Sequence, residues 1–225
     1  MNTKNEPQIE KARIVVVDDH AMVREGLVAL INRTREFTVC GEAESRASAV
    51  KVIAACQPDL VIVDLILSDG DGMELIRTVR DTHPDLPFLV ISMQDEEIYA
   101  ERCLKAGAGG YIMKHAATEE LMTAIHAVLD GDIFISRKMN VRLLMKLADP
   151  NQANAHQGLK SLTDRELQVY QMFGAAMTTR EIASTLGISP KTIATHRENI
   201  KLKMGFKDSR ALIHSAMQWQ TYSGA

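Results

Sequence analysis

The chain has 225 residues, of which 46% are hydrophobic and 24% are charged, an ordinary balance for a protein with a buried core. This composition excludes a mainly disordered or collagen-like chain, and the length suits one large domain or two small ones. The longest apolar run, residues 60–67, is too short to span a bilayer, and residues 1–9 show no secretory leader. Three widely spaced cysteines, Cys40, Cys56 and Cys103, suit free thiols in a reducing compartment. We therefore expect a cytoplasmic protein that does not enter a membrane.

The charge is unevenly distributed along the chain. Residues 159–225 carry nine Lys or Arg and five Asp or Glu, a net charge of +4, whereas the preceding residues carry 17 and 24, a net charge of −7. A basic C-terminal part favours a polyanionic partner. Aromatic residues make up only 4%, too few for a base-stacking surface, which argues against binding of single strands or RNA.

Short apolar runs alternate with amphipathic segments of helix length through the first 130 residues. The runs predict five strands, at Ile14–Val17, Phe37–Cys40, Leu60–Val63, Phe88–Ile91 and Tyr111–Met113. The intervening and following segments predict helices at about 21–32, 45–56, 72–81, 95–106 and 118–130. Strands that are almost wholly apolar are typical of a parallel sheet covered on both faces. The pattern therefore predicts an α/β fold with a doubly wound, five-stranded parallel sheet.

A second, smaller, all-α domain is predicted to follow a linker. A helical segment at about 137–147 leads into residues 148–158, which are polar and lack apolar periodicity. Beyond them, Thr163 and Thr178 each precede a glutamate by three residues, the capping-box spacing that opens a helix. Gly187 ends the second of these helices, Ser189 caps a third, and a fourth is predicted from about Asp208 to Trp219.

Polar side chains stand at the carboxyl ends of the predicted strands, where open α/β sheets bind ligands. They are Asp18 and Asp19 after the first strand, Asp64 after the third, Ser92 at the end of the fourth and Lys114 after the fifth. Each alone is commonly a turn former, a helix cap or a solvated side chain. Together, three carboxylates need a cation, and Mg²⁺ suits oxygen ligands. With Mg²⁺ bound, Asp64 would be a nucleophile towards a phosphoryl group, whose oxygens Lys114 and Ser92 would contact.

Four segments resemble the motifs of the receiver domain of two-component response regulators. They are IVVVDDH (14–20), LVIVDL (60–65), LVIS (89–92) and GYIMK (110–114). The resemblance covers about residues 11–133 and implies a flavodoxin-like fold. Ser68 departs from the family, which usually has proline at this position in the loop after Asp64, so this loop can differ in stiffness from that of the family. Met93 replaces the usual small residue after Ser92.

The resemblance also implies a role for each matched residue. Asp64 matches the aspartate that a sensor histidine kinase phosphorylates. Asp18, Asp19, Asp64 and the backbone carbonyl of Ile66 match the Mg²⁺ ligands, with Asp19 matched to the direct contact. Ser92 and Lys114 match the residues that contact the phosphoryl group, and Tyr111 matches the aromatic switch, which swings inward on phosphorylation.

Residues 178–202 have the spacing of a helix-turn-helix, in which two short helices flank the glycine turn at Gly187. A small helical interaction domain with solvated charges is the alternative. Three segments resemble the LuxR-type helix-turn-helix over about residues 159–220: LTDRE (162–166), TREIASTL (179–186) and GISPKTIATHRENI (187–200). The resemblance places the recognition helix at 189–204, with DNA contacts from Lys191, Thr192, Ala194, Thr195, Arg197, Glu198 and Lys201. His196 is interpreted as structural.

A receiver followed by this module is the arrangement of the NarL/FixJ class of response regulators. The implied domains are a receiver at 11–133, a linker helix and flexible linker at 134–158, and the DNA-binding domain at 159–220. The implied function is a phosphorylation-controlled transcriptional regulator that binds double-stranded promoter DNA, as a homodimer when active, and is not a classical enzyme. The receiver would catalyse its own phosphotransfer and dephosphorylation.

Two other functions stay open from the sequence. A metal-dependent phosphatase or phosphotransferase would turn over a small phosphoester, although the short predicted loops leave little room for a substrate. A regulator that works without phosphate would still bind DNA as an Asp64→Ala variant.

Overall fold

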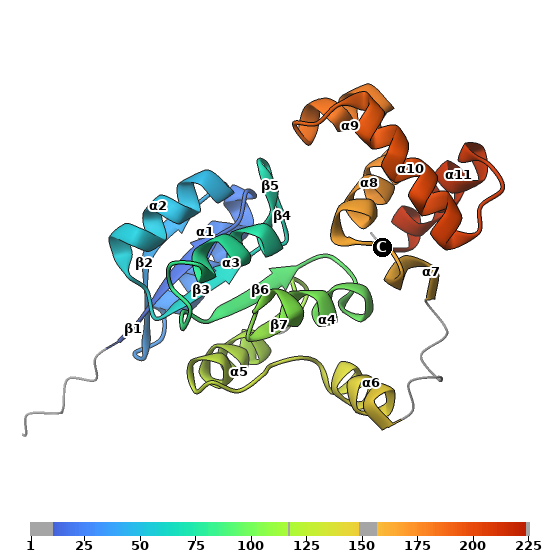
Figure 1. Cartoon of the computed structure of the whole chain (residues 1–225). Helices are drawn as coiled ribbons and strands as arrows, with labels where there is room; N and C mark the ends of the chain where they lie inside the picture. The colour runs from blue at the N-terminus through green and yellow to red at the C-terminus, as the bar shows by residue number, and fades with distance from the viewer. Residues whose placement is uncertain (1–10, 117, 149–156, 224–225) are drawn as a thin grey trace, which may run out of the picture. The chain divides into compact units, whose positions relative to one another are not determined.

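The computed structural model describes residues 11–116, 118–148 and 157–223 (Figure 1). These residues divide into two compact units. The first comprises the chain up to Ser92 together with Cys103–Ser136, and the second comprises Met93–Arg102 and the chain from Arg137 onward. The division passes through one helix, α4 (Glu96–Ala106). The domain boundaries inferred above follow the sequence motifs and remain predictions.

The first unit is built on a five-stranded parallel sheet in the order β2-β1-β3-β6-β7. The strands are β1 (Ala12–Val17), β2 (Phe37–Ala43), β3 (Leu60–Val63), β6 (Phe88–Ser92) and β7 (Gly110–Met113). Each contains the apolar run that predicted it and extends that run by at most three residues. The predicted doubly wound α/β sheet is confirmed, because the strand order reverses direction at β1 and β3.

Helices cover both faces of this sheet (Figure 1). On one face, α1 (Ala21–Asn32) and α5 (Thr118–Leu129) contribute Ile31 and Ile125 to a buried cluster with Ile14 of β1. Burial of these side chains stabilises the fold by removing apolar area from water. The sheet is therefore anchored on this face by residues from distant parts of the chain.

The opposite face is covered by α2 (Arg46–Cys56), beside which α3 (Gly72–Arg80) packs. Val52 of α2 lies so close to Gly41 of β2 that a Cβ at this glycine would be 2.5 Å from the valine side chain. Only glycine permits this close packing of helix on strand.

A short hairpin between β3 and α3 was not predicted from the sequence. Its strands, β4 (Ile66–Leu67) and β5 (Gly70–Asp71), pair antiparallel. Two-residue strands contain too few positions for an apolar period, so pattern analysis has nothing to detect. The hairpin begins two residues after Asp64, and its geometry therefore affects the candidate site.

The described part of the second unit contains six further helices, shown in Figure 1. They are α6 (Arg137–Ala148), α7 (Gln157–Lys160), α8 (Asp164–Gly174), α9 (Thr179–Thr185), α10 (Pro190–Met204) and α11 (Ser209–Ser223). The predicted four-helix domain is confirmed by α8–α11. The one-turn helix α7 was missed and begins inside the segment predicted as a linker, most of which lies outside the described residues. No helix in the described ranges combines the length and hydropathy needed to cross a membrane.

Local capping sets where the helices of this unit begin. Thr163 and Thr178 each form the predicted capping box, in which the threonine side chain and a glutamate three residues later exchange hydrogen bonds with backbone N–H groups. Ser189 caps α10, with Pro190 at its first position. Leu167 and Ile182 are buried in the core that the helices share.

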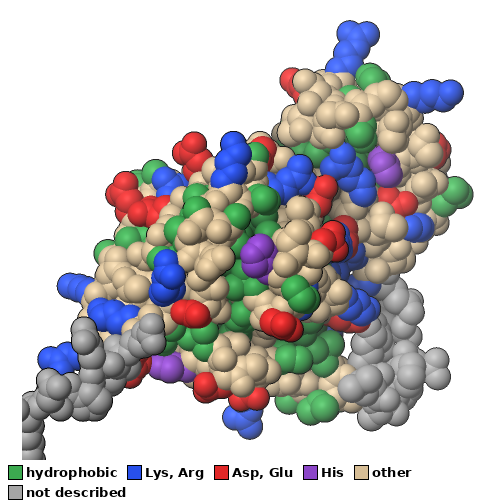
Figure 2. Space-filling view, turned by 60° about the vertical axis from the view of Figure 1, so that its left-hand side comes forward, with side chains coloured by type: hydrophobic (Ala, Val, Ile, Leu, Met, Phe, Trp, Pro, Cys, Tyr) green, Lys and Arg blue, Asp and Glu red, His purple; other side chains and the backbone are tan. Residues whose placement is uncertain are grey.

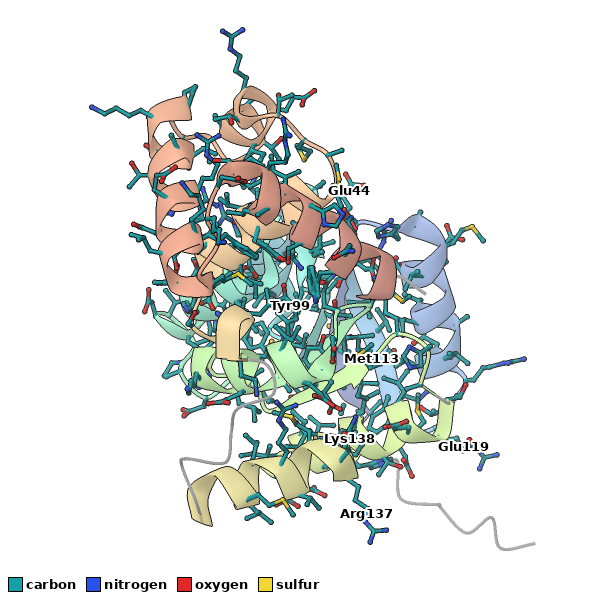
Figure 3. All side chains as sticks on the ribbon, turned by 90° about the vertical axis from the view of Figure 1, so that its right-hand side faces the viewer. Glu44, Tyr99, Met113, Glu119, Arg137 and Lys138 are labelled. Carbon is teal, nitrogen blue, oxygen red and sulfur yellow. The ribbon has the colours of Figure 1, made fainter. Side chains whose placement is uncertain are left out.

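The linker helix α6 is held within its unit by ion pairs to one residue of α4. Lys138 Nζ lies 2.6 Å from Oε1 of Glu97, and Arg142 pairs with Oε2 of the same carboxylate. The hydrogen bond from Lys138 is the main cause that lowers the pKa of Glu97. Arg137 lies on the other side of α6 and points away from these partners (Figure 3).

Glu166 of α8 is a buried carboxylate, 3% exposed, whose removal should destabilise the helical domain. Its Oε2 accepts hydrogen bonds from Thr163 N at 2.8 Å and from Lys203 Nζ at 2.6 Å. Burial acts to raise the pKa of Glu166, but Lys203 and Thr163 outweigh it, and the pKa lies below its ordinary value of 4.5.

We expect Glu166→Gln to reduce the free energy of unfolding by about 2 kcal/mol at pH 7, because a charged hydrogen-bonding partner is lost. A lowered carboxyl pKa stabilises the fold above the unfolded pKa, and this contribution disappears as the pH falls through the folded pKa. The difference between variant and wild type should therefore shrink below about pH 4.5. Urea unfolding followed by the fluorescence of the single tryptophan, Trp219 in α11, measures it; a difference that stays constant with pH would contradict this role.

Candidate functional site

The carboxyl ends of the parallel strands meet at one edge of the sheet, and the structure brings the five predicted phosphorylation-site residues to this edge. The backbone aligns them: Asp64 N donates to Val17 O at 2.9 Å, and Lys114 N donates to Ser92 O at 2.8 Å. The strand register therefore places residues that are distant in sequence beside one another.

Lys114 bridges two buried carboxylates. Its Nζ lies 2.7 Å from Oδ2 of Asp18 and 2.7 Å from Oδ2 of Asp64, and the three side chains are only 8%, 2% and 5% exposed. Burial acts to lower the pKa of Lys114, but the two carboxylates outweigh it and raise the pKa. Burial is also the main cause that raises the pKa of Asp64, against the hydrogen bond from Lys114. The ammonium group is thus the counter-charge of the site in this structure.

Asp19 is engaged differently. Its Oδ1 is shielded from solvent and has no hydrogen-bond partner among the described residues. Nδ1 of His20 lies 2.8 Å from this oxygen, a contact that becomes an ion pair only when the imidazole is protonated. His20 was not predicted as a site residue, although it directly follows the acidic pair; its backbone N–H donates to Asp18 Oδ1 at 2.9 Å.

The residues of this edge fit a divalent cation. One ligand atom from each of Asp18, Asp19, His20 and Asp64 can be chosen so that all lie within 4.8 Å of one another. With Asp18, Asp19 and Asp64 ionised, three negative charges face the single positive charge of Lys114. The net charge of these four side chains is then −2. A buried carboxylate oxygen without a hydrogen-bond partner is the kind of group that a hard cation such as Mg²⁺ satisfies.

The remaining predicted residues of the first unit lie at or beside this edge. Ser92, at the end of β6, is 1% exposed, and Tyr111 of β7 is also buried. Tyr111 is thus already buried in this structure, and its role as the aromatic switch remains a prediction. Ile66, two residues after Asp64, begins the hairpin, and its amide nitrogen lies 3.4 Å from Asp64 Oδ1.

The second candidate site is the exposed face of α10. Ile193 and Ile200 are buried and anchor the helix, while Lys191, Thr192 and Thr195 are exposed. Gly187 adopts φ 62° in the turn before α10, a left-handed conformation that glycine adopts without strain. The observed elements are those of the predicted helix-turn-helix.

Two basic residues of α10 that were predicted to contact DNA lie close to a glutamate of the same helix. Lys201 Nζ lies 2.7 Å from Glu198 Oε2, and Arg197 Nε lies 4.0 Å from Glu198 Oε1. The hydrogen bond from Lys201 lowers the pKa of Glu198. Glu198 thus hydrogen-bonds Lys201, whereas the Nε of Arg197 is shielded from solvent and has no hydrogen-bond partner among the described residues. Ala194 is half-buried.

Two further residues of α10 lie at or near the face predicted to contact DNA. His196 is half-buried, and its Nδ1 is shielded from solvent with no hydrogen-bond partner in the described part of the chain. Leu202, which was not predicted, is 81% exposed four residues after Glu198 and extends the same helix face. Figure 2 shows Lys and Arg side chains standing out from the surface of the helical unit.

Known proteins share both halves of this architecture. Residues 14–126 match the response regulator receiver domain, and residues 160–216 match the luxR family of bacterial regulatory proteins. The oxygen regulatory protein NreC of Staphylococcus aureus is 31% identical over 210 residues, covering 92% of this chain and 97% of that protein.

Solved structures agree with this architecture. A two-component response regulator of the LuxR family from Aurantimonas sp. SI85-9A1 has a TM-score of 0.58 at 32% identity, covering 62% of this chain and all of that one. RcsB from Salmonella enterica serovar Typhimurium, bound to promoter P1flhDC in the presence of phosphomimetic BeF3−, has a TM-score of 0.71 at 24% identity, covering 93% and 100% of the two chains. The second likeness shows the fold alone.

Proposed function

The chain belongs to the response regulators that join a receiver domain to a LuxR-type DNA-binding domain, and from this premise we propose that phosphorylation of Asp64 controls its binding to promoter DNA. It is a regulator and not a classical enzyme. The observation that carries the proposal is the buried contact of Lys114 with Asp18 and Asp64, at 2.7 Å to each carboxylate. The proposed domains are a receiver at 11–133, a linker at 134–158 and a DNA-binding domain at 159–220.

Asp64 would accept the phosphoryl group. A carboxylate oxygen attacks the phosphorus of a phosphohistidine on a sensor histidine kinase, the P–N bond breaks, and an acyl phosphate forms on Asp64. Asp18, Asp19, Asp64 and the carbonyl of Ile66 would hold Mg²⁺, which supplies neutralisation of the phosphoryl charge when bound. The shielded Oδ1 of Asp19 supports this assignment.

Two neighbouring residues would respond to the new charge. Lys114, which already contacts Asp64, would pair with a phosphoryl oxygen as a point charge. The hydroxyl of Ser92 would donate to another oxygen and draw its strand end towards Asp64, with Tyr111 held inward. The receiver would later catalyse hydrolysis of its own acyl phosphate.

The output would be a change in domain docking or dimer formation. Helix-turn-helix proteins usually read paired half-sites as dimers, so we propose a homodimer on a near-palindromic site. The contacts would come from α10, through Lys191, Thr192, Ala194, Thr195, Arg197, Glu198 and Lys201. The proposed compartment is the cytoplasm, where promoter DNA and the kinase's phosphohistidine would both be available.

The experiment that tests this function compares duplex binding with and without phosphorylation. Genomic fragments enriched by the phosphorylated protein would be titrated by fluorescence anisotropy, with the protein pretreated with Mg²⁺ alone or with Mg²⁺ and acetyl phosphate. We expect about a tenfold change in affinity, within the usual range of coupling between two sites. Equal affinities at full labelling would contradict the proposal.

Lys191→Ala should weaken duplex binding in a salt-dependent way. Lys191 is exposed in the first turn of α10, and the backbone N–H groups of a helix N-terminus can also bind a phosphate. Loss of one phosphate contact should reduce the slope of log K against log [salt] by about 1. The control is Lys51→Ala, an exposed lysine of α2 in the first unit. If both variants keep the wild-type slope, Lys191 makes no phosphate contact.

A further inference from the structure

The hairpin that follows the phosphoacceptor carries the backbone carbonyl proposed as a metal ligand. In it, Ile66 pairs with Asp71 and Leu67 pairs with Gly70. Two-stranded hairpins are marginally stable alone, and this one has only two residues in each strand. The position of the Ile66 carbonyl therefore depends on what fastens the hairpin to the rest of the unit.

The base of the hairpin is fastened next to Asp64. Gly72 N donates to Leu65 O at 2.8 Å, and Met73 N donates to Asp71 Oδ1 at 2.8 Å at the start of α3. A Cβ on Gly72 would lie 2.2 Å from the carbonyl oxygen of Asp64, so only glycine allows the chain to cross there. These contacts hold one end and leave the tip, residues 68–69, to be held from elsewhere.

Asp69 holds the tip against the N-terminus of α2. Its Oδ1 accepts a hydrogen bond from Arg46 N at 2.7 Å, and its Oδ2 accepts one from Ala47 N at 2.9 Å. These are two of the N–H groups that a helix leaves without partners in its first turn, where the helix dipole also favours a carboxylate. Asp69 is exposed; desolvation of its carboxylate acts to raise the pKa, but the two N–H donors outweigh it, and the pKa of Asp69 is lowered.

The side chain of Arg46 reinforces this attachment. A Cβ on Gly70 would be 3.4 Å from the guanidinium carbon of Arg46, so the guanidinium lies over the hairpin, and Arg46 also pairs with Glu74 of α3. Ser68 Oγ lies 3.5 Å from the carbonyl oxygen of Glu44, a long contact (Glu44 is labelled in Figure 3). The Asp69 carboxylate thus makes the two short hydrogen bonds at the tip.

We infer that Asp69 is a positioning residue of the metal site: by fastening the hairpin to α2, it holds the Ile66 carbonyl where a divalent cation can bind it. The inference rests on the proposed function, which assigns that carbonyl to Mg²⁺. Asp69 would supply the stiffness that a proline at position 68 would otherwise contribute, because Ser68 does not restrict the backbone as proline does. Without Asp69, cation binding would have to order the hairpin and would become weaker.

The test is a Mg²⁺ titration of the full chain, followed by amide chemical shifts without any phosphodonor. We expect Asp69→Ala to raise the Kd for Mg²⁺ about tenfold, the lower end of the effect of losing a group that orients a ligand. Asp69→Asn should lie between this variant and wild type, because its single side-chain oxygen can accept one of the two bonds. The labelling rate with acetyl phosphate at saturating Mg²⁺ should stay within about twofold of wild type.

Asp59→Ala is the matched control. Asp59 Oδ2 accepts a hydrogen bond from Arg13 N at 2.7 Å, a comparable bond from a carboxylate to the backbone, but at the opposite end of β3 from Asp64. It should leave the Kd for Mg²⁺ unchanged even where it lowers the melting temperature as much as Asp69→Ala. A Kd within twofold of wild type for Asp69→Ala, or an equal rise in Asp59→Ala, would overturn the inference. If wild-type protein binds Mg²⁺ but is never labelled, the proposed function fails, while the comparison of Kd values still decides the role of Asp69.

Discussion

Asp64→Asn should reduce acetyl phosphate labelling from one phosphoryl group per chain to none. An amide has no carboxylate oxygen to attack phosphorus, and it leaves the shape of the site nearly unchanged. Asp18 is also buried and contacts the same lysine, but it accepts a further hydrogen bond from His20 N and lies at the end of a different strand. We therefore expect no transfer to a second carboxylate.

Intact mass spectrometry with acetyl phosphate and Mg²⁺ measures this labelling. Asp59→Asn, at the far end of β3, is the control and should be labelled fully. Labelling of Asp64→Asn at the wild-type stoichiometry would remove Asp64 from its proposed role.

Lys114→Met should destabilise the first unit by about 3–5 kcal/mol at pH 7 without divalent ions, the usual cost of breaking a buried ion pair from one side. Asp18 and Asp64 would remain buried with no positive charge between them. Hydrogen exchange at the amides of β1 and β6 measures the local stability. Lys51→Met, at an exposed position of α2, should have little effect.

Mg²⁺ and pH should both rescue Lys114→Met. Added Mg²⁺ should stabilise the variant more than wild type, because the cation replaces the missing counter-charge. Burial already raises the pKa of Asp64 in the wild-type fold, and loss of Lys114 removes its main opposing influence. A carboxyl group whose folded pKa is raised contributes stability below its unfolded pKa, and this contribution is lost as the pH rises through the folded pKa. The destabilisation should thus shrink as the pH falls; if neither condition changes it, Lys114 is not the counter-charge of the site.

Much of the fold was predictable because its elements are specified locally. The four residues of β3 are apolar and buried, as a central parallel strand requires, and the run 60–63 predicted its bounds. Thr163 and Thr178 predicted where α8 and α9 begin, because a capping box needs only residues three apart. The one-turn helix α7 and the β4–β5 hairpin contain too few residues for any period, and they escaped prediction.

The candidate site divides in the same way. The identities of Asp18, Asp64 and Lys114 could be assigned from strand ends and motifs, because parallel strands end at one edge. That a cation would sit among the carboxylates also followed from their charge. The sequence did not predict that the ammonium group of Lys114 would be the counter-charge between Asp18 and Asp64. A flexible side chain can reach several positions, and only packing selects one.

By itself, the sequence determined the five strands of the sheet, the helices longer than one turn, the two domain types and the chemical groups at the sheet edge, because each depends on residue type at short spacing. Tertiary structure alone decided the partner of each group: Asp69 reaches the N–H groups of Arg46 and Ala47, and Glu198 engages Lys201 instead of leaving it free. Such contacts depend on distances through space that are set when buried surfaces pack, and they cannot be predicted from the spacing of residues along the sequence.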